Sequence, residues 1–218
     1  NDANSAELKP RYPNVGDYQY YRSDKIKLLI KKSNLLFKES EADLQLDTLL
    51  SAEKFIENSK KKYPLGPHEI DHLEFIRYLI AHSYYYIYNK YDIAIALVQK
   101  SIDEYPDLES DNRIYTLKFL ANLKGRNNEY DVAVKHLKLA NSLNRKNTGK
   151  YSPSKQKILF DDSIAVEDML VESLLFLNKK KEALEIFDTN RSKFYTDFKK
   201  NINQSLNSFK LDNIISNL

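Results

Sequence analysis

Apolar and polar residues recur along most of this chain with the period of an α-helix. Beginning at Ser23, a residue type that favours helix N-caps, apolar side chains are spaced so that they fall on one helical face. After a polar turn the same spacing resumes. The residues concerned are Ile26, Leu29, Ile30, Leu36 and Phe37, then Leu46, Leu49, Leu50 and Ile56. The pattern predicts a hairpin of two helices, and no segment of the sequence gives a credible strand pattern.

The second helix of this hairpin belongs to a pattern that occurs four times. It has small and apolar residues at fixed spacing, followed in two copies by tyrosine and proline. The copies are Ala52, Ile56, Ser59 and Tyr63-Pro64; Ala94, Val98, Ser101 and Tyr105-Pro106; Tyr130, Ala133, Leu137 and Ala140; and, more weakly, Ala183, Phe187 and Asn190. A single hairpin cannot bury its apolar face alone, so the copies are expected to stack into a solenoid with a long free surface.

Proline and glycine mark the ends of the predicted hairpins. Gly66-Pro67 separates the first hairpin from the second, and proline is well suited to the first position of a helix. Ser152-Pro153 has the same role before a long helix that is expected to reach about Leu177. We therefore expect about nine helices, including a final one from about Thr196 to Ser216.

The two ends of the chain differ from the repeated part. Residues 1–22 contain two prolines and a glycine and are predicted to form an extended arm that partly docks on the first helices. Residues 198–218 carry an apolar stripe that is expected to cap the open end of the last hairpin. The stripe consists of Phe198, Ile202, Leu206, Phe209 and Ile214.

The small-residue spacing resembles that of the tetratricopeptide repeat family, whose unit is a pair of antiparallel helices of about 34 residues. The family's helix B alanine matches Ala52, Ala94, Ala133 and Ala183, and its closing proline matches Pro64 and Pro106. Helix A positions match at Tyr78, Ala81, His82 and Tyr85, and at Leu117, Leu120 and Ala121. The resemblance implies an all-α, right-handed superhelix of about four antiparallel helix pairs over residues 23–197, followed by the capping helix.

The chain departs from the family pattern in its spacing. Its four alanines are farther apart than the repeat length, so the first helices of the second and fourth units are expected to be longer and the superhelix irregular. Arg145 and Tyr195 replace the closing proline of the third and fourth units, and Val171 replaces a small residue.

Helix A lines the concave groove in this family, so the resemblance also implies a site. The predicted groove residues are Ile76, Leu79, Ser83 and Tyr86 in the second unit, and Tyr115, Lys118, Asn122 and Arg126 in the third. Some grooves of the family hold a partner's C-terminal carboxylate with a lysine and an asparagine one turn apart, as Lys118 and Asn122 are. The other units lack this pair, so the resemblance covers only part of such a clamp.

One motif points to catalysis instead. Residues 68–72 read His-Glu-Ile-Asp-His and match H-E-x-x-H, in which two histidines bind zinc and the glutamate activates water. The alternative function is therefore a zinc-dependent hydrolase with His68 and His72 as ligands and Glu69 as base. Pro67 places the motif in the first helical turn, Asp71 adds an unusual charge, and no strand is available to hold a substrate. These features favour a protein that is not an enzyme and needs no cofactor.

Composition limits the other functions. The formal charge of +3 arises from 34 basic and 31 acidic residues that are well mixed among 218, which gives no indication of nucleic-acid binding. Cysteine is absent, so disulfides, thiolate metal sites and a cysteine nucleophile are excluded. No apolar run approaches the roughly 18 residues of a membrane span.

The sequence leaves the cellular compartment open. The chain begins at Asn1, and a lipoprotein signal upstream would place that residue directly after a lipidated cysteine. A cytoplasmic protein and an extracytoplasmic lipoprotein that belongs to a membrane-anchored assembly are both compatible with the sequence. The favoured prediction is a scaffold that binds a protein or peptide partner in its concave groove.

Overall fold

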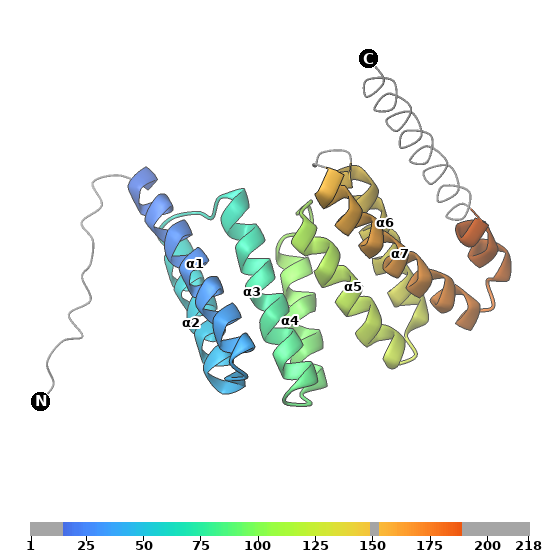
Figure 1. Ribbon diagram of the computed structural model, residues 1–218, viewed down its shortest axis with the longest axis horizontal. Coiled ribbons are helices and arrows are strands. Elements are labelled where there is room, and N and C mark those ends of the chain that lie inside the picture. The colour runs from blue at the N-terminus through green and yellow to red at the C-terminus, as the bar shows by residue number, and fades with distance from the viewer. Residues whose placement is uncertain (1–14, 149–152, 189–218) are drawn as a thin grey trace, which may run out of the picture. The chain divides into compact units, whose positions relative to one another are not determined.

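The protein is all-helical over the part that the computed structural model describes, residues 15–148 and 153–188 (Figure 1). Side chains are described for residues 18–147 and 164–188. The helices are α1 (Val15–Lys38), α2 (Ala42–Lys60), α3 (Pro67–Tyr86), α4 (Tyr91–Glu104), α5 (Asp111–Arg126), α6 (Tyr130–Thr148) and α7 (Pro153–Phe176). Residues 180–188 are helical as well, and the described residues contain no strand. Residues 1–14 of the predicted arm, which spans residues 1–22, and the predicted cap at residues 198–218 lie outside the described part.

The chain divides into two compact units, residues 1–116 and 117–218, with the boundary inside α5. In the first unit α1 packs on α2, α2 on α3, and α3 on α4. In the second unit α6 packs on α7. Consecutive helices therefore form hairpins within each unit, as the apolar pattern predicts.

The turn inside each hairpin has the same backbone conformation. In each of the turns that follow α1, α3, α5 and α7, a single residue adopts a positive φ between 55° and 63°. These residues are Ser40, Asn89, Asn128 and Asn178. Asparagine tolerates this left-handed conformation better than most residues, because its short side chain can bond to nearby backbone. The next amide donates to a carbonyl in the last turn of the helix, for example Glu129 N to Lys124 O at 2.9 Å. These four equivalent turns indicate four helical hairpins within the described residues.

The alanines that carry the repeat pattern lie in the cores of the two units. Ala52 and Ala94 are fully buried in the first unit, as are Ala133 and Ala183 in the second. A small side chain lets two helices approach closely, and the remaining volume is filled by larger residues from the neighbours. Around Ala52 these include Ile26, Leu49, Ile56, Leu73, Ile76 and Ile80.

The first helix begins earlier than the sequence pattern indicated, at Val15 rather than at Ser23. Its first turns pack through aromatic rings. The Tyr18 ring centroid lies 4.6 Å from that of Tyr63, and the Tyr21 ring meets Phe55 edge-on at 6.5 Å. Residues 15–22 are therefore helical, because tyrosines that lacked an obvious apolar period bury ring area against α2 and the turn that follows it.

Candidate protein-interaction surface

A row of aromatic side chains runs along α3 and faces outward. The row, here called the aromatic strip, consists of Phe75, Tyr78, His82 and Tyr86, which are three or four residues apart and so share one helical face. Neighbouring ring centroids are separated by 6.4, 5.9 and 4.4 Å in that order. Tyr115 of α5 extends the strip sideways, because its ring lies 6.4 Å from that of Tyr78.

The strip is partly open to solvent. Tyr86 is 51% exposed, and the other members are half-buried. Burial lowers the pKa of His82 below its usual value, so the imidazole is neutral at neutral pH and fits an aromatic surface. The result is a set of rigid rings that offers apolar area together with hydroxyl groups.

The predicted groove residues of the first unit fall into two groups. Tyr86 belongs to the aromatic strip, Tyr115 lies beside it, and Leu79 is half-buried beside the core. Ile76 and Ser83 differ from the expectation, since Ile76 is 0% exposed and Ser83 is also buried. The Ser83 hydroxyl donates to the carbonyl oxygen of Leu79 at 3.0 Å within its own helix. These two residues are part of the core and present no surface to a partner.

In the second unit, Asn122 and Arg126 line a cleft of about 340 Å³ between α5, α7 and the start of α6. Arg126 Nε donates to Asn122 Oδ1 at 3.2 Å. Tyr130 and Phe176 also line the cleft and stack on each other, with ring centroids 4.4 Å apart and ring planes 8° apart. Glu172 and Ser173 of α7 also line the cleft, whereas Lys118 does not. The structure thus places two of the three predicted polar residues in one depression.

A second cleft of the same unit, about 470 Å³, lies between α6 and residues 180–188. Lys138 of α6 forms an ion pair with Glu182 across it. Asn141 lies in its wall with an oxygen atom that has no hydrogen-bond partner among the described residues. The sequence analysis did not identify this cleft.

The residues of the H-E-x-x-H motif have structural partners. Both Glu69 carboxylate oxygens accept hydrogen bonds from Arg22 of α1, Nε to Oε1 and Nη2 to Oε2, at 2.5 Å each. Oε2 also accepts from the backbone N–H of Gly66 at 2.8 Å and so caps the start of α3. The glutamate is buried, and its carboxylate is occupied by a guanidinium where a water-activating base would need to reach solvent.

The two histidines of the motif differ in their surroundings. His68 is exposed, and His72 is half-buried. Burial lowers the pKa of His72 below its usual value, although Asp71 opposes this shift. Among the residues with described positions, no group of three His, Asp or Glu side chains is arranged to hold a metal ion.

Arg22 is one of three arginines that the sequence analysis missed. Arg22, Arg77 and Arg113 come from α1, α3 and α5, and each is exposed by 1% or less. Buried arginine is rare, so its position could not be read from an apolar pattern. Two of these arginines bind backbone carbonyls just after the second helix of a hairpin, α2 or α4. Arg22 donates to the carbonyls of Tyr63 at 2.8 Å and Pro64 at 2.9 Å, and Arg113 donates to that of Tyr105.

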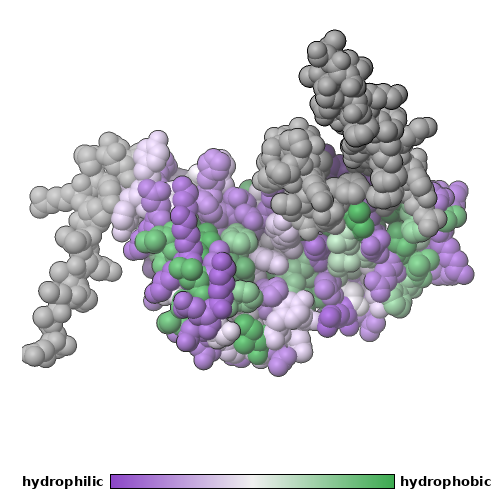
Figure 2. Space-filling view, viewed as in Figure 1, coloured by the Kyte–Doolittle hydropathy of each residue, from purple (hydrophilic) through white to green (hydrophobic). Residues whose placement is uncertain are grey.

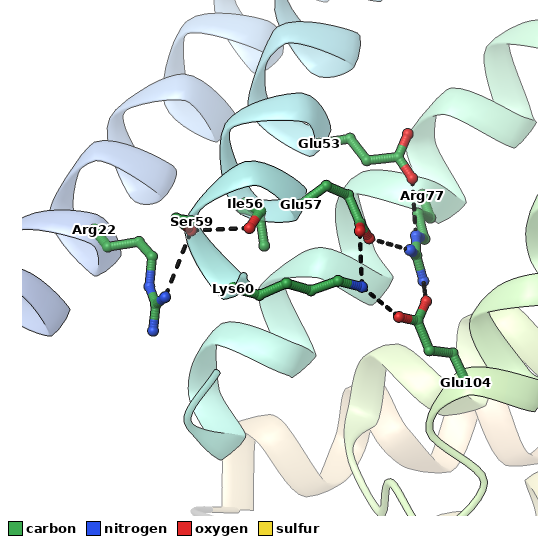
Figure 3. Close-up of polar contacts among 8 residues, drawn as sticks. All are labelled: Arg22, Glu53, Ile56, Glu57, Ser59, Lys60, Arg77 and Glu104. Carbon is green, nitrogen blue, oxygen red and sulfur yellow. Dashed lines mark hydrogen bonds and ion pairs between the residues drawn. The ribbon is translucent and has the colours of Figure 1, made fainter. Parts of the chain in front are cut away.

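Arg77 holds a network of acidic side chains that connects α2, α3 and α4 (Figure 3). It forms ion pairs with Glu53 at 2.9 Å, Glu57 at 2.6 Å and Glu104 at 2.8 Å. Lys60 also bridges Glu57 at 2.7 Å and Glu104 at 2.5 Å. Burial alone would raise the pKa of Glu104, but the hydrogen bonds from Lys60 and Arg77 hold it below its usual value. The network therefore links the first hairpin to the second.

The Arg113 site is less well compensated. Arg113 Nη2 lies 3.1 Å from Glu74 Oε2, and both side chains are almost completely buried. Burial raises the pKa of Glu74 to about 7 in spite of the nearby guanidinium. Burial also lowers the pKa of Arg113, and Glu74 opposes that shift. For both side chains, desolvation by burial is the largest cause of the pKa shift.

Comparison with known proteins matches no family model and no curated protein. Among solved structures, the chain is similar to BtubC (BKLC) from P. vanneervenii, with 14% sequence identity, 82% of each chain covered and a TM-score of 0.50. The chain has a tetratricopeptide-like helical repeat fold. A putative kinesin light chain with nearly identical TPR-like repeats from Podosopora anserina is similar at 12% identity, 78% of this chain and 95% of that chain covered, with a TM-score of 0.42. Within the described part of this repeat protein, no helix has the length and apolarity that a membrane crossing requires.

Proposed function

We propose that this repeat protein is a non-enzymatic scaffold that binds a peptide or a partner helix along the aromatic strip of α3. The observation that carries the proposal is the contrast between the two sides of that helix. The buried side is fixed by ion pairs to α2 and α5, while the other side presents Tyr86 and its neighbours to solvent. A rigid surface of this kind binds without a large loss of conformational entropy.

The chemistry of the strip suits a peptide partner. Tyrosine provides a large flat apolar area and one hydroxyl, and it loses little side-chain entropy on binding. Tyrosine is also enriched among the residues that dominate protein interfaces. We expect a partner segment to lay apolar side chains over Tyr78 and Tyr86 and to accept hydrogen bonds from their hydroxyls.

We assign the cleft of the second unit a related role. Arg126 and Asn122 there present a cation and an amide close together, and this pair suits a carboxylate or a peptide carbonyl of a partner. Lys118 does not line the cleft, and we propose that it adds a positive charge one turn before Asn122 on α5.

The competing function, a zinc-dependent hydrolase, has less support. A general base must reach a metal-bound water, whereas Glu69 is paired with Arg22 at 2.5 Å and caps α3. An interaction scaffold does not require Glu69 to leave Arg22.

Site-specific photo-cross-linking tests the scaffold. A photoreactive amino acid at position 86 of the full chain should capture a partner segment in the source cell, and one at position 126 tests the cleft of the second unit in the same way. The matched controls are positions 93 and 139, since Ile93 and Leu139 are exposed apolar residues of α4 and α6. Equal capture at the control positions would show that the aromatic strip and the cleft have no special role.

Each captured segment then serves as a synthetic ligand. Tyr86→Ala should weaken binding of a segment captured at position 86, and Lys118→Ala binding of one captured at position 126, by about 1 kcal/mol or more, roughly fivefold or more, while the circular dichroism spectrum stays unchanged. Unchanged affinity in both variants would remove the groove assignment.

A further inference from the structure

The outer face of α1 combines exposed leucines with lysines. Leu28 and Leu35 are 67% and 59% exposed, and they lie seven residues apart, which places them two helical turns apart on one side of the helix. Tyr20, 77% exposed, precedes them on the same outer side. Ile26, on the opposite side of α1, and Leu36, about a quarter turn from the two leucines, are buried in the first unit.

Lysines border the two leucines on both sides. By helical position, Lys27, Lys31 and Lys38 lie on one side of the leucine pair and Lys32 lies on the other. All four are exposed. We call Leu28, Leu35 and these four lysines the basic face of α1. Over the described part of the chain, Figure 2 shows green apolar residues between purple hydrophilic ones in the region of α1 and α2.

Few acidic residues of the protein compensate the basic face. Asp24 lies 3.7 Å from Lys27, and both side chains of this pair are largely exposed. The structure gives Lys31, Lys32 and Lys38 no ion-pair partner among the described residues. The face therefore keeps a net positive charge beside exposed apolar area, in contrast to Arg22 and Arg77, which are fully compensated by carboxylates.

The position of α1 in the repeat array explains why this face is open. The corresponding contact of α3 is made by the preceding hairpin, since α3 packs on both α2 and α1. No described helix precedes α1. In a helical repeat array, each hairpin buries the exposed side of its neighbour, and the first hairpin keeps that side for a cap or a partner.

We propose that the basic face of α1 docks an acidic amphipathic helix of another protein. Leucines two turns apart fit between the apolar residues of a second helix, and glutamates or aspartates beside those residues would pair with the lysines. The proposal concerns α1 alone and does not depend on the aromatic strip of α3.

The charges of the chain disfavour its own terminal segments as occupants. Residues 1–14 contain two acidic and two basic side chains, and residues 189–218 contain five basic and two acidic ones. Neither segment is acidic. A second copy of the chain would bring the same lysines against each other in a symmetric contact. A lipid surface is also a poorer fit, because the apolar stripe is only one leucine wide and the other side of α1 is already buried.

The test uses the full chain and a synthetic helical peptide of about 20 residues, roughly 30 Å long, with leucines on one face and glutamates on both sides of them. Binding is followed by fluorescence anisotropy of a dye on the peptide. We expect saturable binding that weakens as salt is added. Lys31→Glu with Lys32→Glu should weaken binding at least about tenfold, and Leu28→Ser with Leu35→Ser should do the same. The matched control is Lys54→Glu with Lys61→Glu, which makes the same charge change at exposed positions elsewhere in the first unit and should bind like the wild type.

Several outcomes would overturn the proposal. One is that the glutamate peptide does not bind. Another is that a peptide with lysines in place of the glutamates binds equally well. A further one is that Lys54→Glu with Lys61→Glu weakens binding as much as Lys31→Glu with Lys32→Glu does. Stronger binding to vesicles of phosphatidylcholine with about one-third phosphatidylserine, lost in the same variant, would assign the face to a membrane. Concentration-dependent self-association that Leu28→Ser with Leu35→Ser abolishes would assign it to a second copy.

Discussion

Arg22 and Glu69 join α1 to α3 through two parallel hydrogen bonds, each 2.5 Å long, in a position that excludes solvent. The arginine also donates to the carbonyls of Tyr63 and Pro64, where the chain leaves α2. One guanidinium thus fixes three segments of the first unit. The glutamate that a zinc hydrolase would need as a base is here a partner in an ion pair that holds two hairpins together.

The first prediction concerns this pair. Arg22→Ala should lower the free energy of unfolding by about 3 to 5 kcal/mol, because it leaves the Glu69 carboxylate buried without a cation. Glu69→Ala should have a comparable effect on Arg22. Urea denaturation at neutral pH measures both. Lys27→Ala removes the exposed pair with Asp24 and should change stability by less than about 1 kcal/mol. A loss in Arg22→Ala as small as in this control would contradict the assigned role.

The second prediction is a pH dependence at Glu74. Burial raises the pKa of Glu74 to about 7 in the folded protein, from an ordinary value of 4.5. The folded state therefore binds a proton more tightly than the unfolded state. This contribution to stability is fully present below about pH 4.5 and is lost as the pH rises through 7.

Glu74→Gln should remove that dependence. Between pH 5 and pH 8 the wild-type stability should fall by about 2 kcal/mol more than that of the variant, as measured by urea denaturation at each pH. Glu39→Gln, at an exposed position of the first unit, serves as the control. Parallel pH profiles for wild type and Glu74→Gln would show that the carboxyl stays ionised beside Arg113 over this range.

The sequence was sufficient to predict the repeat fold because small residues at helix crossings are visible as a pattern. Ala52, Ala94, Ala133 and Ala183 are all buried, and the helix starts at Pro67 and Pro153 are confirmed. The four turns with positive φ could have been found too, since three of them contain asparagine shortly after the end of an apolar period.

The interior polar network could not be predicted in the same way. Arg22, Arg77 and Arg113 belong to a residue type that is nearly always exposed, and their acidic partners lie on other helices. Whether an arginine is buried depends on tertiary contacts that an apolar period does not contain. Ile76 and Ser83 also could not be placed from the sequence, but here residues predicted to be exposed are buried. The family register placed them on the groove, but the exact rotation of α3 turns them into the core.

The third prediction addresses zinc. Protein purified without a histidine tag should contain far less than one equivalent of zinc by elemental analysis, and a chelator should leave its thermal unfolding temperature unchanged, because the described residues contain no group of three His, Asp or Glu side chains arranged to hold a metal ion. His72→Ala should not alter either measurement. Stoichiometric zinc that is lost in His72→Ala would restore the hydrolase as the leading function.

The fourth prediction tests the crossing of α3 and α4. Ala94→Leu should lower the free energy of unfolding by about 1 to 3 kcal/mol, because Ala94 is fully buried and extra volume forces the two helices apart. Ala96→Leu is the matched control, since it adds the same atoms at an exposed position of the same helix. Similar stabilities for the two variants would mean that the crossing can absorb a larger side chain.

The last prediction concerns the end of the repeat array. Leu175, Leu184 and Phe187 of the second unit are exposed by 52%, 58% and 42%, so the last described hairpin leaves apolar area uncovered by the described residues. Residues 198–218 carry an apolar stripe and are predicted to cover such an end. Truncation after Tyr195 should therefore increase the binding of a hydrophobic dye and promote aggregation during size-exclusion chromatography. Deletion of residues 1–14 removes a terminal segment of low apolar content and serves as the control. A truncated protein that stays monomeric and binds no more dye than the control would show that the array needs no cap at this end.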